Sequence, residues 1–282
     1  MSSSTLPTLY GMLQRSLSYA LLPILCLLAG LETAMAQAIP TESDFKSAPK
    51  IEFRIDTDLY TDESKPPIGT TQTVFVGNRV FEWDDTHRTL LVVDYQDQSV
   101  TLADLRTQTK CRFNMSDLEQ RLSKLRTQMT SEQLRLWTAQ SNPAYGQDGY
   151  FSLASERATY VFKTAPAKSE GMAIQYAEFA DWSVRLYAVN PPFKPPLLRM
   201  QLNAFLREKK DLPIEIRLSD LRSKGTKPIT ARLIVQSELS STDRERVRDW
   251  EILAGTLKPS SESDFFRLAS GTPENPAKRL QR

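Results

Sequence analysis

The stretch Gly171–Arg207 decides the fold of this 282-residue chain. It reads Gly171-Met-Ala-Ile-Gln-Tyr-Ala-Glu-Phe-Ala-Asp-Trp-Ser-Val-Arg-Leu-Tyr-Ala-Val189, then Asn190-Pro-Pro-Phe-Lys-Pro-Pro196, then Leu197-Leu-Arg-Met-Gln-Leu-Asn-Ala-Phe-Leu-Arg207. Residues recur at three- and four-residue spacing in both halves, which predicts two amphipathic helices joined by a proline-rich corner. The recurring residues are Met172, Tyr176, Phe179, Ser183 and Leu186, and then Leu198, Leu202 and Phe205. Each stripe must be buried against a sheet or another helix, so we expect Phe179 and Phe205 to be shielded from solvent.

Residues 50–115 predict an antiparallel β-meander, because short strand-like segments follow one another with connections too short for parallel crossovers. Gly77-Asn78 is typical of a two-residue hairpin turn. The segment Thr57–Gly69 is predicted as a loop. The predicted strands are Ile51–Asp56, Thr71–Val76, Arg79–Trp83, Thr89–Tyr95, one that begins at Val100, and Thr109–Phe113. Of these, Thr89–Tyr95 is a continuous apolar run, which favours a central strand covered on both faces.

Residues 116–269 predict helices and further strands. A capping box at Ser116–Glu119 begins a helix over 117–139, with a second start near Thr130, and its stripe is expected to lie across one face of the meander. A second capping box, at Thr242–Glu245, begins a later helix. The strands expected here are 158–164, a strand opened by Pro213 and ending at Leu218, and 229–239. The last two are expected to form a hairpin.

The predicted fold class is therefore α+β, with a largely antiparallel β-meander sheet covered by amphipathic helices. Residues 50–269 form a single domain with a meander half (50–115) and a helix-rich half (116–269). Residues 270–282 are charged, contain proline and have almost no apolar residues, so a disordered tail is expected. Residues 37–49 are expected to form a linker.

The first 36 residues predict a signal peptide. Arg15 precedes a 15-residue apolar run, Leu17–Leu31, and Ala34-Met-Ala36 fits a small-x-small cleavage site. The run is short for a membrane span of about 20 residues. We therefore expect export, periplasmic or secreted, after cleavage near Ala36, with no integral membrane span in the mature chain.

Charge and cysteine content exclude some classes of protein. After cleavage the chain keeps 35 basic and 33 acidic residues, so no basic face for nucleic acid is implied. Cys111 is the one cysteine left, which excludes an intrachain disulfide. Its alternation with charged neighbours predicts a buried, inert thiol.

The motifs of common catalytic and metal sites are missing, so no catalytic, cofactor-binding or metal-ligating residue is assigned. His87 is the single histidine, and no Gly-x-Ser-x-Gly or glycine-rich phosphate loop occurs. The acidic segment Asp56–Glu63 lacks ligand positions of a calcium loop. Glu178 and Asp181 share a helix face and could act in acid–base catalysis, but Asp181 and Arg185 are also spaced for an intrahelical ion pair.

The aromatic residues of the connection 141–157 are the candidates for contact with a ligand or partner. They are Tyr145, Tyr150 and Phe151. Loops held on a rigid scaffold often bind, although the same residues could instead plug the edge of the core.

Two resemblances bear on function. The block Tyr176-Ala-Glu-Phe-Ala-Asp-Trp182, with Pro195-Pro-Leu-Leu-Arg-Met-Gln-Leu-Asn203 and Leu212-Pro-Ile-Glu-Ile216, resembles a family of uncharacterised exported bacterial proteins over most of residues 70–255. This family implies no activity. Export, the meander and the apolar helices also resemble periplasmic lipoprotein carriers, in which a sheet wraps around helices to leave an apolar cavity; this is an analogy of fold.

The leading hypothesis is an exported, non-enzymatic protein that binds an apolar small molecule or an unknown protein partner in carrier-like fashion, without cofactor or nucleic acid. One alternative is an extracytoplasmic hydrolase that uses acidic residues such as Glu178 or Asp181. Another is a structural part of an envelope assembly. An apolar cavity favours the first, convergent carboxylates in a cleft favour the second, and an exposed apolar patch favours the third.

Overall fold

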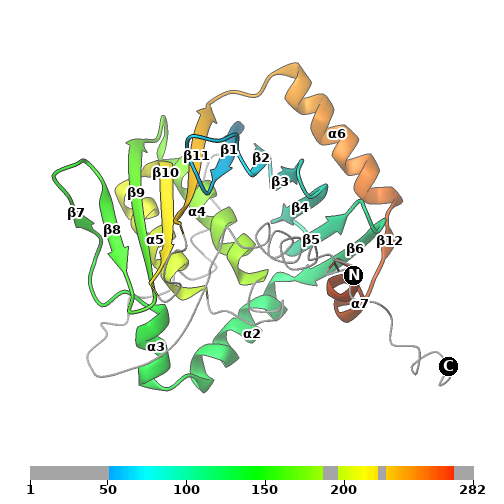
Figure 1. Cartoon of the computed structure of the whole chain (residues 1–282). Coiled ribbons are helices and arrows are strands. Elements are labelled where there is room, and N and C mark those ends of the chain that lie inside the picture. Colours follow the sequence, from blue (N-terminus) through cyan, green and yellow to red (C-terminus); the bar gives the residue numbers. More distant parts are fainter. Residues whose placement is uncertain (1–50, 187–195, 222–226, 270–282) are drawn as a thin grey trace, which may run out of the picture.

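The computed structural model describes residues 51–186, 196–221 and 227–269 (Figure 1). Over these residues the chain forms six helices and one 12-stranded open sheet. The strands are β1 (Phe53–Tyr60), β2 (Gly69–Val76), β3 (Arg79–Asp84), β4 (Thr89–Asp94), β5 (Ser99–Asp104), β6 (Thr109–Asn114), β7 (Ala144–Tyr145), β8 (Phe151–Ala154), β9 (Ala158–Pro166), β10 (Asp211–Asp220), β11 (Ile229–Gln236) and β12 (Lys258–Pro259). The helices are α2 (Met115–Gln128), α3 (Ser131–Trp137), α4 (Glu170–Arg185), α5 (Leu197–Lys209), α6 (Ser241–Thr256) and α7 (Glu262–Ala269).

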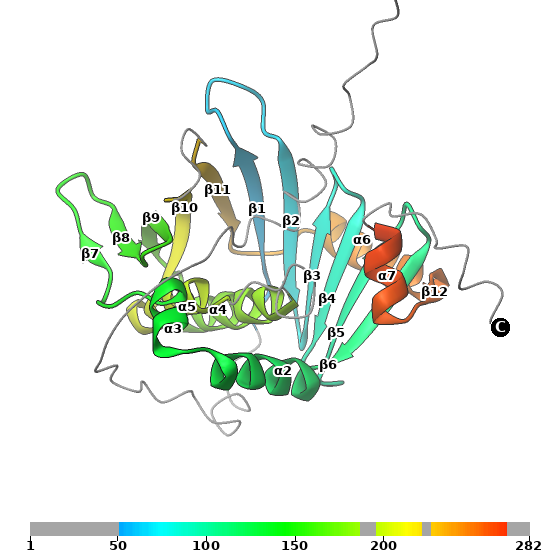
Figure 2. The same cartoon turned by 60° about the horizontal axis from the view of Figure 1, so that its bottom comes forward.

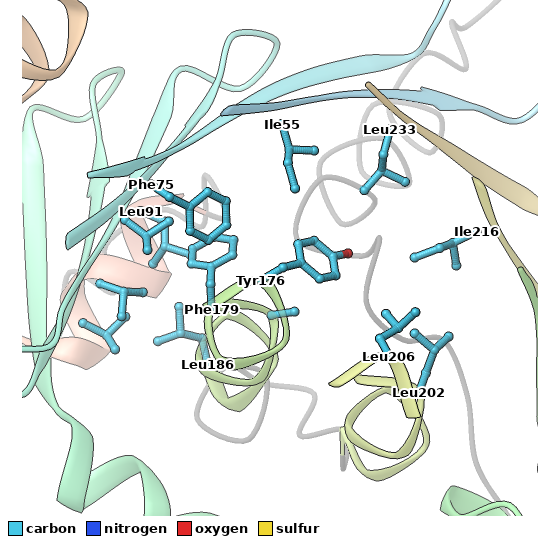
Figure 3. Close-up of a cluster of buried hydrophobic side chains, with 14 of the residues drawn as sticks. Ile55, Phe75, Leu91, Tyr176, Phe179, Leu186, Leu202, Leu206, Ile216 and Leu233 are labelled. Carbon is cyan, nitrogen blue, oxygen red and sulfur yellow. The ribbon is translucent and has the colours of Figure 1, made fainter. Parts of the chain in front are cut away.

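The sheet is antiparallel except where β12 joins β6, and its order is β12-β6-β5-β4-β3-β2-β1-β11-β10-β9-β8-β7. The α+β class and the antiparallel meander are therefore confirmed. β1 pairs with β11 along most of its length, with Thr57 opposite Leu233, and this pairing joins the two halves of the chain in one sheet. The strands form an arch, and α4 and α5 run beneath it (Figures 1 and 3).

The main buried cluster joins side chains of the sheet to side chains of α4, α5 and α7. Among its members are Phe53, Phe75, Phe162, Phe179, Leu202 and Phe265. Phe179 is 4% exposed, and Phe205 is half-buried with its ring edge-on against Phe151 and Phe162, so neither aromatic residue of the predicted stripes stands free in solvent. Phe265 is fully buried, as expected of a docked C-terminal segment.

A second cluster lies on the other face of the meander, where α6 packs (Figure 2). Leu90 of β4 belongs to this cluster, whereas its neighbour Leu91 belongs to the main cluster. The prediction of a central strand covered on both faces is thus confirmed. Phe81 and Trp83 share the α6 face, with ring centroids 6.4 and 6.2 Å from that of Trp250.

The predicted loop Thr57–Gly69 is too long by several residues. β1 continues to Tyr60 and β2 begins at Gly69, because Leu59 extends the inward alternation of Phe53 and Ile55. Asp58, which disguised the pattern, points to the other side, where its carboxylate accepts a hydrogen bond from the Tyr60 hydroxyl (3.4 Å).

Both predicted capping boxes begin two residues too late. The N-cap of α2 is Asn114, without a side-chain cap, and that of α6 is Ser240, whose hydroxyl accepts from the backbone N–H of Asp243 (3.1 Å). At α6 the third helical residue of the box is Asp243, where Glu or Gln is usual, so the pattern Ser240–Asp243 was not recognised as a capping box. The predicted second start is confirmed, because Thr130 and Gln133 form a capping box at the start of α3.

The predicted position of the α2 stripe is only partly correct. Leu118 reaches the main cluster, but Leu122 packs with Leu136, Trp137 and Leu197 from α3 and α5. The chain breaks between α2 and α3. The second part of the α2 stripe therefore packs against α3 and α5, in a small cluster of helical side chains, and not against the meander.

Pro213 lies inside β10 rather than at its start. The pairing of β10 with β9 shifts register between Pro213 and Glu215, which is where a strand accommodates a residue without an N–H donor. β10 and β11 form the expected antiparallel pair, and β11 ends at Gln236 rather than at residue 239.

Some predictions lie outside the described residues. They are the signal peptide (1–36), the linker (37–49), the proline-rich corner up to residue 195 and the tail (270–282). Within the described ranges, no helix combines the length and the apolar character needed to cross a membrane.

Candidate functional site

A cavity of about 170 Å³ lies between α4 and the inner face of the sheet. Its lining is mainly apolar. The strands supply Ile55, Leu59, Leu91, Leu102, Ile216, Leu218, Ile229, Ala231 and Leu233. α4 supplies Tyr176, Phe179, Ala180 and Ser183, and Leu186 follows directly after α4. Figure 3 shows Tyr176 and Phe179 pointing from α4 toward Ile55 and Phe75 of the sheet.

The local sequence explains this lining. Alternate residues of a strand point to one face, so Ile229, Ala231 and Leu233 of β11 all reach the cavity. On α4 the same three- and four-residue spacing that predicted the helix places its stripe toward the strands. The cavity is therefore built by the stretch that decides the fold.

Arg199 is a cation in this lining, near the start of α5, and is only 7% exposed. Its Nη2 donates to the hydroxyl oxygen of Tyr176 (3.0 Å). Within the described residues its Nε has no hydrogen-bond partner and its guanidinium forms no ion pair. The charge is thus buried beside a neutral partner.

Tyr160 of β9 also lines the cavity and is 2% exposed. Its hydroxyl oxygen has no hydrogen-bond partner among the described residues. Burial raises the pKa of Tyr160 to about 12, against the opposing effect of the Arg199 charge. The hydroxyl therefore stays protonated and is free to donate a hydrogen bond.

Glu82 of β3 contributes a carboxyl group to the same wall. The Thr73 hydroxyl donates to Glu82 Oε2 (3.1 Å). Burial raises the pKa of Glu82 to about 7, Asp84 adds to the increase, and Arg199 and the Thr73 hydrogen bond oppose it. Glu82 is half-buried: part of its surface faces the cavity, and protein atoms cover the remainder.

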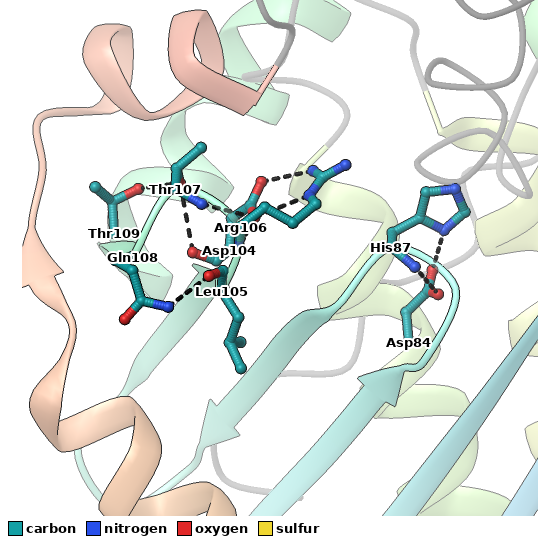
Figure 4. A network of polar contacts seen from close by, with 8 residues as sticks. All are labelled: Asp84, His87, Asp104, Leu105, Arg106, Thr107, Gln108 and Thr109. Atoms are coloured by element: carbon teal, nitrogen blue, oxygen red, sulfur yellow. Dashed lines mark hydrogen bonds and ion pairs between the residues drawn. The ribbon is translucent and has the colours of Figure 1, made fainter.

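Polar turns lie at the end of the sheet where Asp84 and Thr89 line the cavity. His87 Nδ1 lies 2.8 Å from Asp84 Oδ2, and the His87 backbone N–H donates to Asp84 Oδ1 (2.9 Å), so this pair closes the β3–β4 turn (Figure 4). The β5–β6 turn is closed in the same way by the buried carboxylate of Asp104, which pairs with Arg106 (2.6 Å).

Cys111 and His87 are the single cysteine and the single histidine among the described residues, and each has a structural environment of its own. Cys111 is buried in the main cluster, and burial raises the pKa of its thiol to about 11, so the prediction of an inert thiol is confirmed. His87 pairs with Asp84.

Among the residues that the structure describes, no group of three or more potential ligands could hold a metal ion. Asp62 of the acidic segment pairs with Lys227, whose ammonium lowers the pKa of Asp62.

Glu178 and Asp181 do not line the cavity. Asp181 accepts hydrogen bonds from Asn203 Nδ2 (2.7 Å) and Arg207 Nη2 (3.2 Å), so it ties α4 to α5. The predicted pair with Arg185 is therefore replaced by a pair with Arg207. Arg185 lies over the ring of Trp182, 4.3 Å from its centroid. Burial raises the pKa of Glu178 to about 7.

The aromatic candidates Tyr145, Tyr150 and Phe151 lie on the β7–β8 hairpin, where an irregular connection was expected. Tyr145 is 69% exposed, and its ring centroid lies 4.8 Å from that of Phe151. Phe151 stacks on Phe162 of β9 (5.5 Å) and meets Phe205 of α5 (5.0 Å), so it covers the edge of the core. None of the three candidates lines the cavity.

Tyr150 is held on the outer face of the sheet. Its hydroxyl donates to Glu215 Oε1 (3.2 Å), and the Arg217 guanidinium lies 4.8 Å from its ring centroid. Gly149, next to it, adopts φ +81°, the left-handed conformation that a tight turn requires and that glycine adopts without strain. The hairpin thus fixes the aromatic residues and leaves Tyr145 as the accessible one.

Sequence reasoning did not single out Arg199, Tyr160 or Glu82. Arg199 precedes Leu202 by three residues and Leu206 by seven, so an arginine occupies a core position of the stripe. This charged residue at an apolar position was the available signal. Tyr160 and Glu82 lie on predicted strands, and nothing local marks them.

No known family model matches the sequence, and no curated protein is significantly similar to it. The fold and the cavity alone define the class: an α+β protein with an open, mostly antiparallel sheet and a mainly apolar cavity against its inner face.

Proposed function

We propose that this chain is an exported, non-enzymatic protein that binds an apolar ligand in the cavity in carrier-like fashion. In this proposal α4 and α5 cover the concave face of the sheet and turn it into a container. One observation carries the proposal: the space between α4 and the sheet is lined mainly by apolar side chains. The resemblances to exported proteins and to lipoprotein carriers support it as analogies.

The size of the cavity sets what can enter without rearrangement. A dry apolar cavity of about 150 Å³ is large enough to bind benzene. The cavity here, about 170 Å³, would take one ring or a short length of hydrocarbon chain. A longer chain would have to extend past the polar turns at its end or separate α4 from the strands.

Filling the cavity should abolish binding of an apolar probe. Ala231 of β11 lines the cavity, and Ala231→Phe would occupy the space. We expect the wild-type protein to bind toluene, an apolar probe with one ring, and Ala231→Phe to bind it at least about tenfold more weakly, a loss of about 1.4 kcal/mol. Isothermal titration calorimetry measures both affinities.

The matched control is Ile234→Phe, which adds bulk on the same strand but on the opposite face, where Ile234 is 56% exposed. Its affinity should equal that of the wild type. Circular dichroism checks that both variants fold. A wild-type protein that leaves the probe unbound, or equal affinities of the two variants, would contradict the proposal.

Export is the second part of the proposal, and it rests on the sequence of residues 1–36. Full-length protein produced in a bacterium is expected in the envelope or secreted fraction with a new N-terminus at or near Gln37. N-terminal sequencing of that fraction is the measurement. Recovery of uncleaved chain from the cytosol would count against export but would leave ligand binding untouched.

A further inference from the structure

Arg199 carries a buried charge that forms no ion pair within the described residues. Buried charges in proteins are ordinarily paired, because removal of a charge from water costs several kcal/mol unless an opposite charge or several hydrogen bonds replace the solvent. Arg199 has one hydrogen bond within the described residues, and its acceptor is the neutral hydroxyl of Tyr176. A guanidinium offers five N–H donors, so one neutral hydroxyl acceptor leaves most of its hydrogen-bonding capacity unused.

Tyr160 presents a second unused donor to the same space. Its hydroxyl and Arg199 Nε are both buried without a partner, and both residues line the cavity. Both groups line the same cavity, and the Arg199 charge partly opposes the increase that burial causes in the pKa of Tyr160. Two donors and a positive charge call for a ligand group that accepts hydrogen bonds and is negative.

Three carboxyl groups could neutralise Arg199: Glu82 and Asp84 in the lining, and Asp181 of α4, which acts on Arg199 electrostatically. Within the described residues none of them forms an ion pair with Arg199, because Asp84 pairs with His87 and Asp181 pairs with Arg207. Glu82 is the one of the three without a cationic partner among the described residues. Thr73 donates to its carboxyl group, and burial favours the protonated form. The positive charge of Arg199 is therefore left largely for a ligand.

We propose that the ligand is a single-chain amphiphile whose anionic headgroup binds Arg199 and the Tyr160 hydroxyl, while its chain contacts the apolar lining around Phe179 and Leu233. The inference rests on the proposed function and deepens it by naming the ligand class. Carboxylate and phosphate headgroups share this chemistry, and both accept paired hydrogen bonds from a guanidinium.

The test compares ligands that share a ten-carbon chain and differ in headgroup. Isothermal titration calorimetry measures the binding of decanoate, decyl phosphate and decanol to the wild-type protein at pH 6, where both acids are anionic and Glu82, with a pKa of about 7, is mostly protonated. At least one anion should bind about tenfold or more tightly than decanol. The order of decanoate and decyl phosphate identifies which headgroup the site prefers.

Arg199→Met separates recognition of the headgroup from apolar binding of the alkyl chain. It should lower the affinity for the preferred anion about tenfold or more and leave the affinity for decanol unchanged. Arg126→Met, which removes an exposed arginine of α2, is the control and should change neither affinity. Without ligand, Arg199→Met should melt no lower than the wild type, because the charge it removes is buried and unpaired.

Tyr160→Phe keeps the inference testable if Arg199→Met fails to fold. It removes one hydroxyl and should reduce the preference for the anion several-fold, with the affinity for decanol unchanged. Equal binding of all three ligands by the wild-type protein would overturn the headgroup inference while supporting an apolar ligand. Binding of none of them would overturn the proposed function as well.

Discussion

Phe179→Ala is expected to lower the free energy of unfolding by about 3–5 kcal/mol, the usual loss for a buried phenylalanine. Phe179 is the point where α4 meets the sheet: its ring meets that of Phe75 edge-on at 5.7 Å, and Phe75 stacks on Phe53 at 4.0 Å. The void would open onto the existing cavity, so neighbouring side chains could not easily collapse into it. Denaturation in guanidinium chloride measures the change.

Ile252→Ala on α6 is the control for this variant. Ile252 is 67% exposed, so its truncation should change the free energy of unfolding by no more than about 0.5 kcal/mol. If Phe179→Ala lost no more stability than Ile252→Ala, α4 would not be packed against the sheet, and the cavity would lose its wall.

The second large effect is a dependence of stability on pH that Glu82 causes. The pKa of Glu82 is about 7 in the folded protein, whereas an unfolded chain restores its ordinary value of 4.5. Between these values the folded state binds more protons, so stability is highest below the ordinary pKa and falls as pH rises through 7. The loss is at most about 3 kcal/mol, at 1.36 kcal/mol per pKa unit, and water in the cavity would reduce it.

Glu82→Gln should remove this contribution, because an amide cannot ionise. The comparison uses urea denaturation at pH 5 and pH 8, and the quantity of interest is the difference between wild type and variant at each pH. Other groups near Glu82 stay in place in both proteins: Thr73, Asp84 and Arg199. Glu178, whose pKa is also raised to about 7, contributes equally to both curves.

The control is Glu245→Gln, which removes an exposed carboxylate from α6 and should leave the pH dependence of the wild type unchanged. A difference between wild type and Glu82→Gln that stays constant from pH 5 to pH 8 would show that Glu82 is ionised in the folded protein. In that case its carboxylate would compensate Arg199, and the headgroup inference would lose one of its supports.

Local patterns predicted most elements of the fold. The stripe of Met172, Tyr176 and Phe179 predicted α4 because a helix repeats every 3.6 residues and one face must be dry. The hairpin at Gly77-Asn78 was predictable because Gly77 requires φ +59°, and its turn type fixes the register of the two strands. In each case the signal lies within one turn of helix or one pair of strands.

The errors and omissions have nonlocal causes. Leu59 continues the alternation of Phe53 and Ile55, but Asp58 disguised it, and the residue that pairs with Thr57 is Leu233, far along the chain. The candidate site was missed for the same reason: Arg199, Tyr160 and Glu82 come from α5, β9 and β3, and only the closed arch brings them to one cavity. Tyr145, the accessible member of the aromatic candidates, lies on a hairpin apart from that cavity.

The pairing of β1 with β11 has a consequence for how the chain reaches its native state. Translation makes β1 long before β11, so the nascent meander has an open hydrogen-bonding edge until residues 229–236 emerge. Such an edge invites pairing with other chains, and contacts between distant segments slow folding. We therefore expect slow refolding after dilution from denaturant, with aggregation that grows with protein concentration, and a truncated chain that ends before β11 should precipitate.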